Sequence, residues 1–236
     1  MPDPSALSTG FGELDASPTQ RVRVWDLPTR IFHWALAVAV VGQIATGLSG
    51  VMAWHLRNGY LVLALLMFRL VWGFVGGHWS RFASFVHSPS ALVGYLRGRA
   101  RPEQLVGHTP LGALSVFAML AILVAQVATG LVADDEISAS GPLTRFVSSA
   151  TVSLASAWHT TAGKWIVLAL VVLHVLAIVF YALVRHQHLV KPMVSGDKLL
   201  MQLAPASRDT AGSRLLALIV FGACAGFAYW ISTLRL

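Results

Sequence analysis

Four histidines stand inside or at the margins of long apolar segments of this sequence. They are His33, His55, His159 and His174. An ionisable side chain is costly within a bilayer, so a histidine in such a segment calls for a functional explanation. Neutral imidazole is a good ligand for iron, and two imidazoles on one haem iron leave no open position for a substrate. Paired histidines of this kind would therefore serve electron transfer.

The four histidines are expected to pair by depth. His159 and His174 are 15 residues apart, which on one α-helix gives a rise of about 22 Å and a rotation of about 60° beyond four turns. In a chain that crosses the membrane back and forth, His55 and His159 would lie near the outer face, and His33 and His174 near the inner face. The outer site would then combine His55 with His159, and the inner site His33 with His174. For any one of them taken singly, a hydrogen-bonded packing role is the alternative. A zinc or non-haem iron site is disfavoured, because no carboxylate or thiol accompanies them in these segments.

Composition places these histidines in a membrane protein. Of the 236 residues, 56% are hydrophobic and 11% are charged, and the mean hydropathy is +0.69. These values effectively exclude a water-soluble enzyme. Five apolar segments are long enough to cross a hydrocarbon layer about 30 Å thick. The predicted spans cover residues 25–50, 54–76, 109–132, 157–184 and 215–232.

The distribution of charge predicts the orientation. Most Lys and Arg lie beside the first span, between the second and third, or after the fourth. The positive-inside rule therefore places the N-terminus in the cytoplasm and the C-terminus in the periplasm, across a bacterial inner membrane. Because this rule explains the net charge of +7, the charge gives no indication of nucleic acid. The single cysteine, Cys224, excludes an internal disulfide and covalent c-type haem attachment.

The chain is expected to divide into four parts. Residues 1–20 are polar and rich in Pro and Ser, which predicts a flexible cytoplasmic tail. Residues 21–195 would form a four-helix domain and residues 196–213 a cytoplasmic linker. Residues 214–236 would form an extra transmembrane helix. The predicted fold class is thus an all-α integral membrane protein, with a four-helix haem-binding bundle and a fifth C-terminal helix.

Arg69 is the one basic residue deep in a predicted span. It lies 14 residues after His55, hence about 21 Å deeper and near the inner histidine pair. A haem propionate would explain a buried arginine there, whereas snorkelling to the headgroups is the alternative. The five other histidines are expected to be solvated or to contact phospholipid, with His108 as second choice for an inner ligand. They are His78, His87, His108, His186 and His188.

Small residues recur at two places that predict close packing. Residues 43–48 (QIATGL) in the first span are matched by residues 126–131 (QVATGL) in the third. Their Gly and Thr would let either a flat cofactor or a neighbouring helix approach. In the last span, Gly222 and Gly226 form a GxxxG pattern, which favours helix docking. The docked helix could belong to another molecule or to the chain's own core, and Cys224 is expected to report on that face by crosslinking.

Taken together, these residues resemble the prokaryotic cytochrome b561 family, which also includes the b-type cytochrome subunits of nickel-iron hydrogenases. The resemblance covers residues 22 to about 195, in family order. It rests on residues 24–34 (VWDLPTRIFHW), Thr46-Gly47, His55 with Gly59-Tyr60, residues 69–73 (RLVWG), Arg81-Phe82, Tyr95-Leu96, residues 107–112 (GHTPLG), 134–137 (DDEI), 141–143 (GPL), and His159 with His174.

The resemblance implies a four-helix bundle that carries two non-covalent b haems, with ligands on the first, second and fourth helices. Transferred to this chain, the ligands are His33, His55, His159 and His174, the same four that depth selects. The chain departs from the family in two ways. Thr109 stands where the family often has Asn, and a fifth span follows the bundle.

The expected function is that of a dihaem b-type cytochrome moving electrons across the membrane between the quinone pool and a redox partner. The partner could be a c-type cytochrome, a hydrogenase or another dehydrogenase. The alternative is a stand-alone quinone-linked oxidoreductase, such as the superoxide oxidases among the relatives. Acidic residues 134–136 in the outer loop favour a basic protein partner over an anionic substrate. A haem-free transporter or membrane anchor is a third class.

Overall fold

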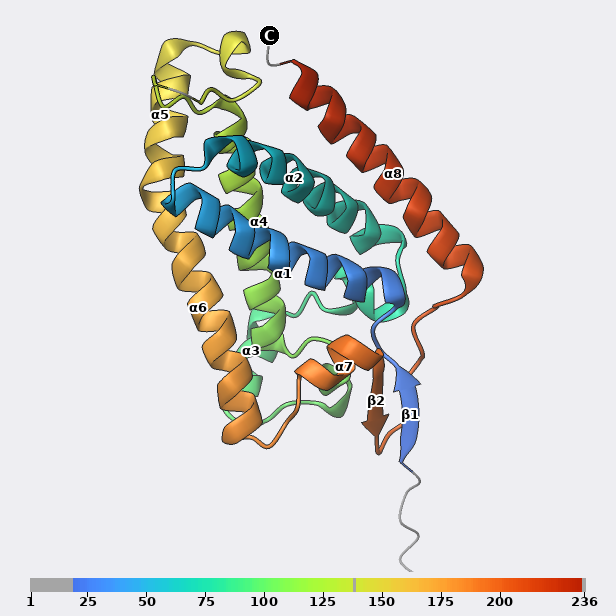
Figure 1. Cartoon of the computed structure of the whole chain (residues 1–236). Helices are drawn as coiled ribbons and strands as arrows, with labels where there is room; N and C mark the ends of the chain where they lie inside the picture. The colour runs from blue at the N-terminus through green and yellow to red at the C-terminus, as the bar shows by residue number, and fades with distance from the viewer. Residues whose placement is uncertain (1–18, 138, 235–236) are drawn as a thin grey trace, which may run out of the picture.

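The computed structural model describes residues 19–137 and 139–234, so nearly all of the expected tail over residues 1–20 lies outside the described residues. Five stretches of helix are long and apolar enough to cross a membrane, as the sequence predicts (Figure 1). They are α1 (Leu27–Leu48), α2 (Met52–Val75), α4 (Pro110–Val132), α5 (Ser149–Thr160) continued by α6 (Ala162–Leu183), and α8 (Ala211–Thr233). The expected all-α membrane class is confirmed.

The fourth span is two helices rather than one. α5 and α6 meet at Thr161, whose φ of −116° and ψ of −94° are not helical. The side chain of Gln126 on α4 donates a hydrogen bond of 2.8 Å to the carbonyl of His159, which supplies a donor at the interrupted end of α5. The span predicted over 157–184 is present, but it starts earlier, at Ser149, and is interrupted at Thr161. Helix geometry alone therefore does not fix the relation between His159 and His174.

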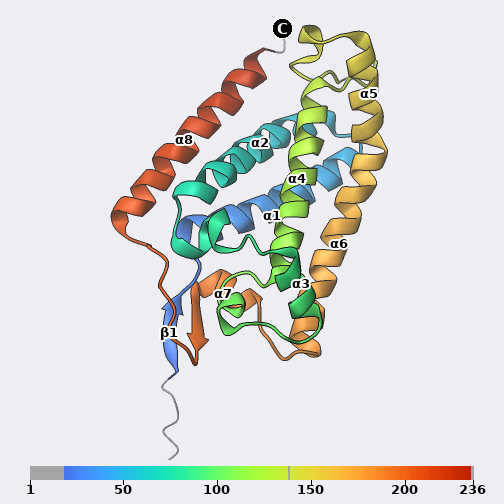
Figure 2. The same ribbon diagram turned by 180° about the vertical axis from the view of Figure 1, so that it is seen from behind.

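α4 is the central support of the bundle. It packs against α2 on one side and against both α5 and α6 on the other. The hairpin of α1 and α2 lies obliquely across α4, in front of it in Figure 1 and behind it in Figure 2. The main apolar core joins Phe68 and Trp72 of α2 to Leu120 and Leu123 of α4 and Val167 of α6. The lower end in Figure 1 also holds the short helices α3 (Pro89–Leu96) and α7 (Val190–Ser195).

Residues 196–213, expected only to link two spans, are tied into the lower end of the protein. Strand β2 (Asp197–Leu200) pairs antiparallel with strand β1 (Gln20–Arg23). Gly196 adopts a positive φ of 90°, which favours glycine, and its carbonyl accepts hydrogen bonds from the backbone of Val24 and Trp25 at 2.9 and 3.0 Å. Two four-residue strands are too short to be read from the sequence pattern.

Asp26 joins the lower ends of α1 and α2. Its side chain caps α1 by accepting a hydrogen bond from the backbone of Thr29 (2.9 Å). It also accepts from the indole of Trp72 (3.2 Å), the backbone of Gly77 (2.8 Å) and the hydroxyl of Ser80 (3.0 Å). The carboxylate is fully buried, and these donors stabilise it there.

The fifth span packs against the bundle through a face other than the one expected. α8 contacts chiefly α2, and the buried residues on its inner face include Ala217, Cys224 and Ala228. Gly222 and Gly226 lie on the exposed face, with open space where a side chain would be. The expectation that Cys224 reports on the glycine face was thus wrong, because the two lie on opposite sides of α8. Oligomer formation through residues 214–236 stays a prediction.

We expect the substitution Ala228→Leu to destabilise the protein by about 1–3 kcal/mol, because the extra atoms must fit into a packed interface between α8 and α2. Gly222→Leu, which adds a larger side chain on the open face of the same helix, is the matched control and should have little effect. The measurement is thermal unfolding of the purified protein in detergent. Equal destabilisation by the two substitutions would contradict this packing.

Candidate functional site

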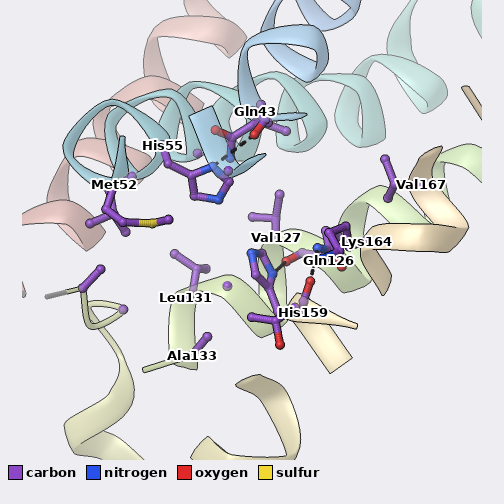
Figure 3. Close-up of a pocket in the computed structure, with 18 of the residues that line it drawn as sticks. Gln43, Met52, His55, Gln126, Val127, Leu131, Ala133, His159, Lys164 and Val167 are labelled. Carbon is purple, nitrogen blue, oxygen red and sulfur yellow. Dashed lines mark hydrogen bonds between the residues drawn. The ribbon is translucent and has the colours of Figure 1, made fainter. Parts of the chain in front are cut away.

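His55 and His159, the pair expected at the outer site, lie where α2 begins and α5 ends (Figure 3). They are called the upper pair below. The centroids of the two imidazole rings are 6.0 Å apart, and the rings are nearly perpendicular. Nδ1 of His55 lies 3.2 Å from the carbonyl oxygen of Gln43, and Nδ1 of His159 lies 2.9 Å from that of Gln126. Because a carbonyl oxygen only accepts, each Nδ1 carries the proton and donates. Each Nε2 is left with a lone pair that can bind a metal.

The two repeated segments build this arrangement. Gln43 and Gln126 each stand four residues before a glycine, hence about one turn away on the same helix face. A Cβ at residue 47 would lie 3.1 Å from His55 Cε1, and one at residue 130 would lie 2.7 Å from His159 Cε1. The glycines therefore make room for the two rings. Sequence reasoning found the repeat but did not assign it to the histidines.

The lower histidine pair, His33 on α1 and His174 on α6, has ring centroids 6.4 Å apart. Among the described residues, Nδ1 of His33 is buried and has no hydrogen-bond partner. The structure thus brings the four histidines together in the two pairs expected from depth. The two pairs differ, since both upper rings donate to backbone carbonyls.

The spacing within each pair fits one metal between two imidazoles. A metal–nitrogen bond to imidazole is about 2 Å long, so rings on opposite sides of one metal have centroids roughly 6 Å apart. No group of three or more His, Cys, Asp or Glu side chains that could hold a metal occurs among residues 19–137 and 139–234. Each pair supplies only two ligands to a metal, so a cofactor must supply the others. A porphyrin supplies four nitrogen ligands. The residues present therefore fit a haem.

A cavity of about 340 Å³ adjoins the upper pair. Apolar side chains make up most of its lining, among them Val40, Val62 and Leu123. Asp134 and Lys164 also line it. This volume and this mainly apolar lining are typical of sites for small molecules and cofactors.

Arg69 is buried inside the lower half of the protein, with 4% of its surface exposed. Its guanidinium carbon lies 4.7 Å from the centre of the Phe82 ring, and Gly73 leaves the space that this ring occupies. Nη1 of Arg69 has no hydrogen-bond partner among the described residues. The side chain is thus held within the protein rather than extended to the headgroups.

His108 differs from its expected solvated state. Its ring packs between those of Trp25 and Phe85, with centroids 4.6 and 4.4 Å away, and its Nδ1 is buried. Burial, followed by the positive charges of Arg69 and Lys198, lowers the pKa of His108 to about 3. The ring is therefore neutral at physiological pH. No sequence pattern indicated this burial, because His108 lies just before α4 rather than within an apolar segment.

Comparison with known proteins identifies the family. The profile of the family described as prokaryotic cytochrome b561 matches residues 24–196. The chain belongs to this family. Among its curated relatives are proteins of Azotobacter vinelandii (27% identity, 81% of this chain and 94% of the relative), Azotobacter chroococcum mcd 1 (26%, 81% and 94%) and Escherichia coli strain K12 (24%, 73% and 88%). No solved structure matches significantly.

The three relatives are each named as a probable B-type cytochrome subunit of a Ni/Fe-hydrogenase. Family membership and the five spans establish a multi-pass membrane b-type cytochrome of electron transfer, and its cofactor is haem b. Thr109, which replaces the Asn common in the family, still caps α4 by accepting a hydrogen bond from the backbone of Gly112 at 3.1 Å. This departure leaves the histidine pairs unaffected.

We expect the substitution Gly130→Ala to lower the haem content of the purified protein, because the added Cβ would displace the ring of His159. Gly226→Ala makes the same change where nothing lies within 4 Å and is the matched control. The haem content per chain is measured by the pyridine haemochrome method. Full haem content in Gly130→Ala would show that this close approach is not needed at the upper site.

Proposed function

We propose that the protein binds two b haems and carries electrons across the membrane between the quinone pool and a redox partner. The supporting observation is the presence of two imidazole pairs, with centroids 6.0 and 6.4 Å apart, at the two ends of one bundle. His55 and His159 would bind the upper haem, and His33 and His174 the lower one. Each haem would supply an iron that changes oxidation state by one electron.

The protein's own residues would position each iron and protect it from substrates. Two histidines would hold each haem, so the iron would carry electrons rather than bind a substrate. The carbonyls of Gln43 and Gln126 orient the upper rings through Nδ1. The apolar side chains that line the cavity would limit the access of water to the upper haem.

The orientation that we propose puts the lower end in the cytoplasm of a bacterial cell and the C-terminus in the periplasm, with the protein in the inner membrane. An odd number of spans separates β1 from the end of α8, which lie at opposite ends in Figure 1. The arginine-rich segments around α3 also lie at the lower end. The positive-inside rule assigns such segments to the cytoplasm.

Two observations at the upper end bear on the partner. Asp134 at the cavity and the exposed Glu136 beside it favour a basic protein, such as a c-type cytochrome. A hydrogenase is the other candidate, because the relatives carry that name. Lys164, which lines the same cavity, favours the second candidate function, a quinone-linked oxidation of the superoxide anion.

We expect the purified protein to contain two haem b per chain with low-spin spectra, because two histidines would hold each iron. His55→Ala and His159→Ala should remove one haem component, and His33→Ala and His174→Ala the other. Potentiometric titration monitored by visible absorption resolves the components. A ratio of one haem per chain, or loss of the same component in His33→Ala and His159→Ala, would contradict the two-site arrangement.

A change of charge beside the cavity of the upper pair would distinguish the two candidate functions. Glu136→Lys should slow electron exchange with a basic c-type cytochrome and weaken the dependence of that rate on salt. If superoxide is the substrate, the same substitution should speed its oxidation instead. Glu103→Lys, at an exposed position at the other end of the protein, is the matched control. Stopped-flow kinetics in detergent measure both reactions.

A further inference from the structure

The lower half of the protein contains two unsatisfied polar groups that rest on one aromatic cluster. Arg69 lies over the ring of Phe82, and the ring of His108 packs against Phe85. The rings of Phe82 and Phe85 are themselves in contact, with centroids 5.9 Å apart. Among the described residues, Nη1 of Arg69 and Nδ1 of His108 are both buried and without a hydrogen-bond partner. Leaving such groups unpaired is costly, so a ligand with acceptor atoms is expected there.

The charges around His108 favour an anion. The groups close enough to affect His108 electrostatically are Arg69, Lys198, His33 and His87, all of them basic. Lys198 is already engaged, since its Nζ donates to the carbonyls of Leu105 and Val106 at 3.0 and 2.9 Å. A buried arginine in such surroundings is stabilised by a carboxylate, which accepts strong charge-assisted hydrogen bonds.

Asp26 is the protein carboxylate that acts on Arg69 electrostatically, but its oxygens are already used. They accept hydrogen bonds from the backbone of Thr29 and Gly77 and from the side chains of Trp72 and Ser80. No ion pair joins Arg69 to a carboxylate among the described residues. The arginine therefore has a free donor near His108, whose electrostatic surroundings also include His33 of the lower pair.

We infer that Arg69 and His108 together hold a propionate carboxylate of the haem that His33 and His174 bind. This inference rests on the proposed function and extends the expectation for Arg69 to a second residue. Arg69 would donate through Nη1 and supply the positive charge. His108, neutral in these surroundings, would donate through Nδ1–H and add direction without a second charge. A quinone carbonyl is the other acceptor that such donors could bind, and the experiment separates the two.

The test compares Arg69→Gln and His108→Phe in the full-length, haem-loaded protein. A positive charge or a hydrogen-bond donor near the haem favours the reduced state, so each substitution should lower the midpoint potential of the lower haem. We expect the larger shift for Arg69→Gln, no shift for the upper haem, and an intermediate effect for His108→Gln, which retains a donor. His78→Phe makes the same change as His108→Phe at a position that lacks these contacts and should leave both potentials unchanged.

A spectroscopic measurement identifies the acceptor directly. Redox-induced infrared difference spectra are recorded with haem carrying ¹³C in its propionate carboxyl groups. Carboxylate bands that respond to the label should shift in His108→Phe. Unchanged bands and an unchanged lower potential would overturn the inference, and so would a shift that disappears when quinone is removed. If two haems are still bound, either of these outcomes overturns the inference but leaves the proposed function unaffected. If the unsubstituted protein binds fewer than two haems, the proposed function itself is refuted.

Discussion

The arrangement of this protein depends on one geometric constraint: the two imidazoles of each histidine pair lie with their ring centroids about 6 Å apart, the spacing that one metal between them requires. One ring of each pair comes from the hairpin of α1 and α2, and the other from α5 or α6. These helices are held at the required separation by α4, which packs against α2, α5 and α6. Gly47 and Gly130 keep the space beside the upper rings open.

The buried polar groups at the two ends of the bundle are hydrogen-bonded in different ways. At the upper end, the imidazoles donate to carbonyls that are exposed on α1 and α4 near the repeated glycines. At the lower end, the buried carboxylate of Asp26 accepts hydrogen bonds from three segments. It thereby fixes the start of α1, seven residues before His33. Among the described residues, Nη1 of Arg69 and Nδ1 of His108 have no hydrogen-bond partner. Each end therefore provides a distinct electrostatic setting for its histidine pair.

Residues outside the histidine-bearing helices brace this framework. β1 and β2 join the start of the chain to the segment before α8, and Arg23 links them through Asp197 and Asp209 at 2.5 and 2.7 Å. α8 then covers α2 on the side away from α5 and α6 (Figures 1 and 2). Its glycine pair faces outward, so the helix docks by its small buried residues and leaves Gly222 and Gly226 on the surface. A sequence pattern identifies small residues, but not which of two small faces meets the neighbour.

The sequence by itself determined the membrane class and the five spans, because these follow from hydropathy. It also predicted which histidines pair, from their approximate depth in the spans, whereas the break at Thr161 means that only the folded structure brings the rings of each pair within reach. It also singled out Arg69, since a charge deep in a span is rare. Only the tertiary structure decided what depends on contacts between distant segments. These are the break at Thr161, the pairing of β1 with β2, the inward face of α8 and the burial of His108. None of them leaves a local pattern, because each is selected by the neighbour it packs against rather than by its own residues.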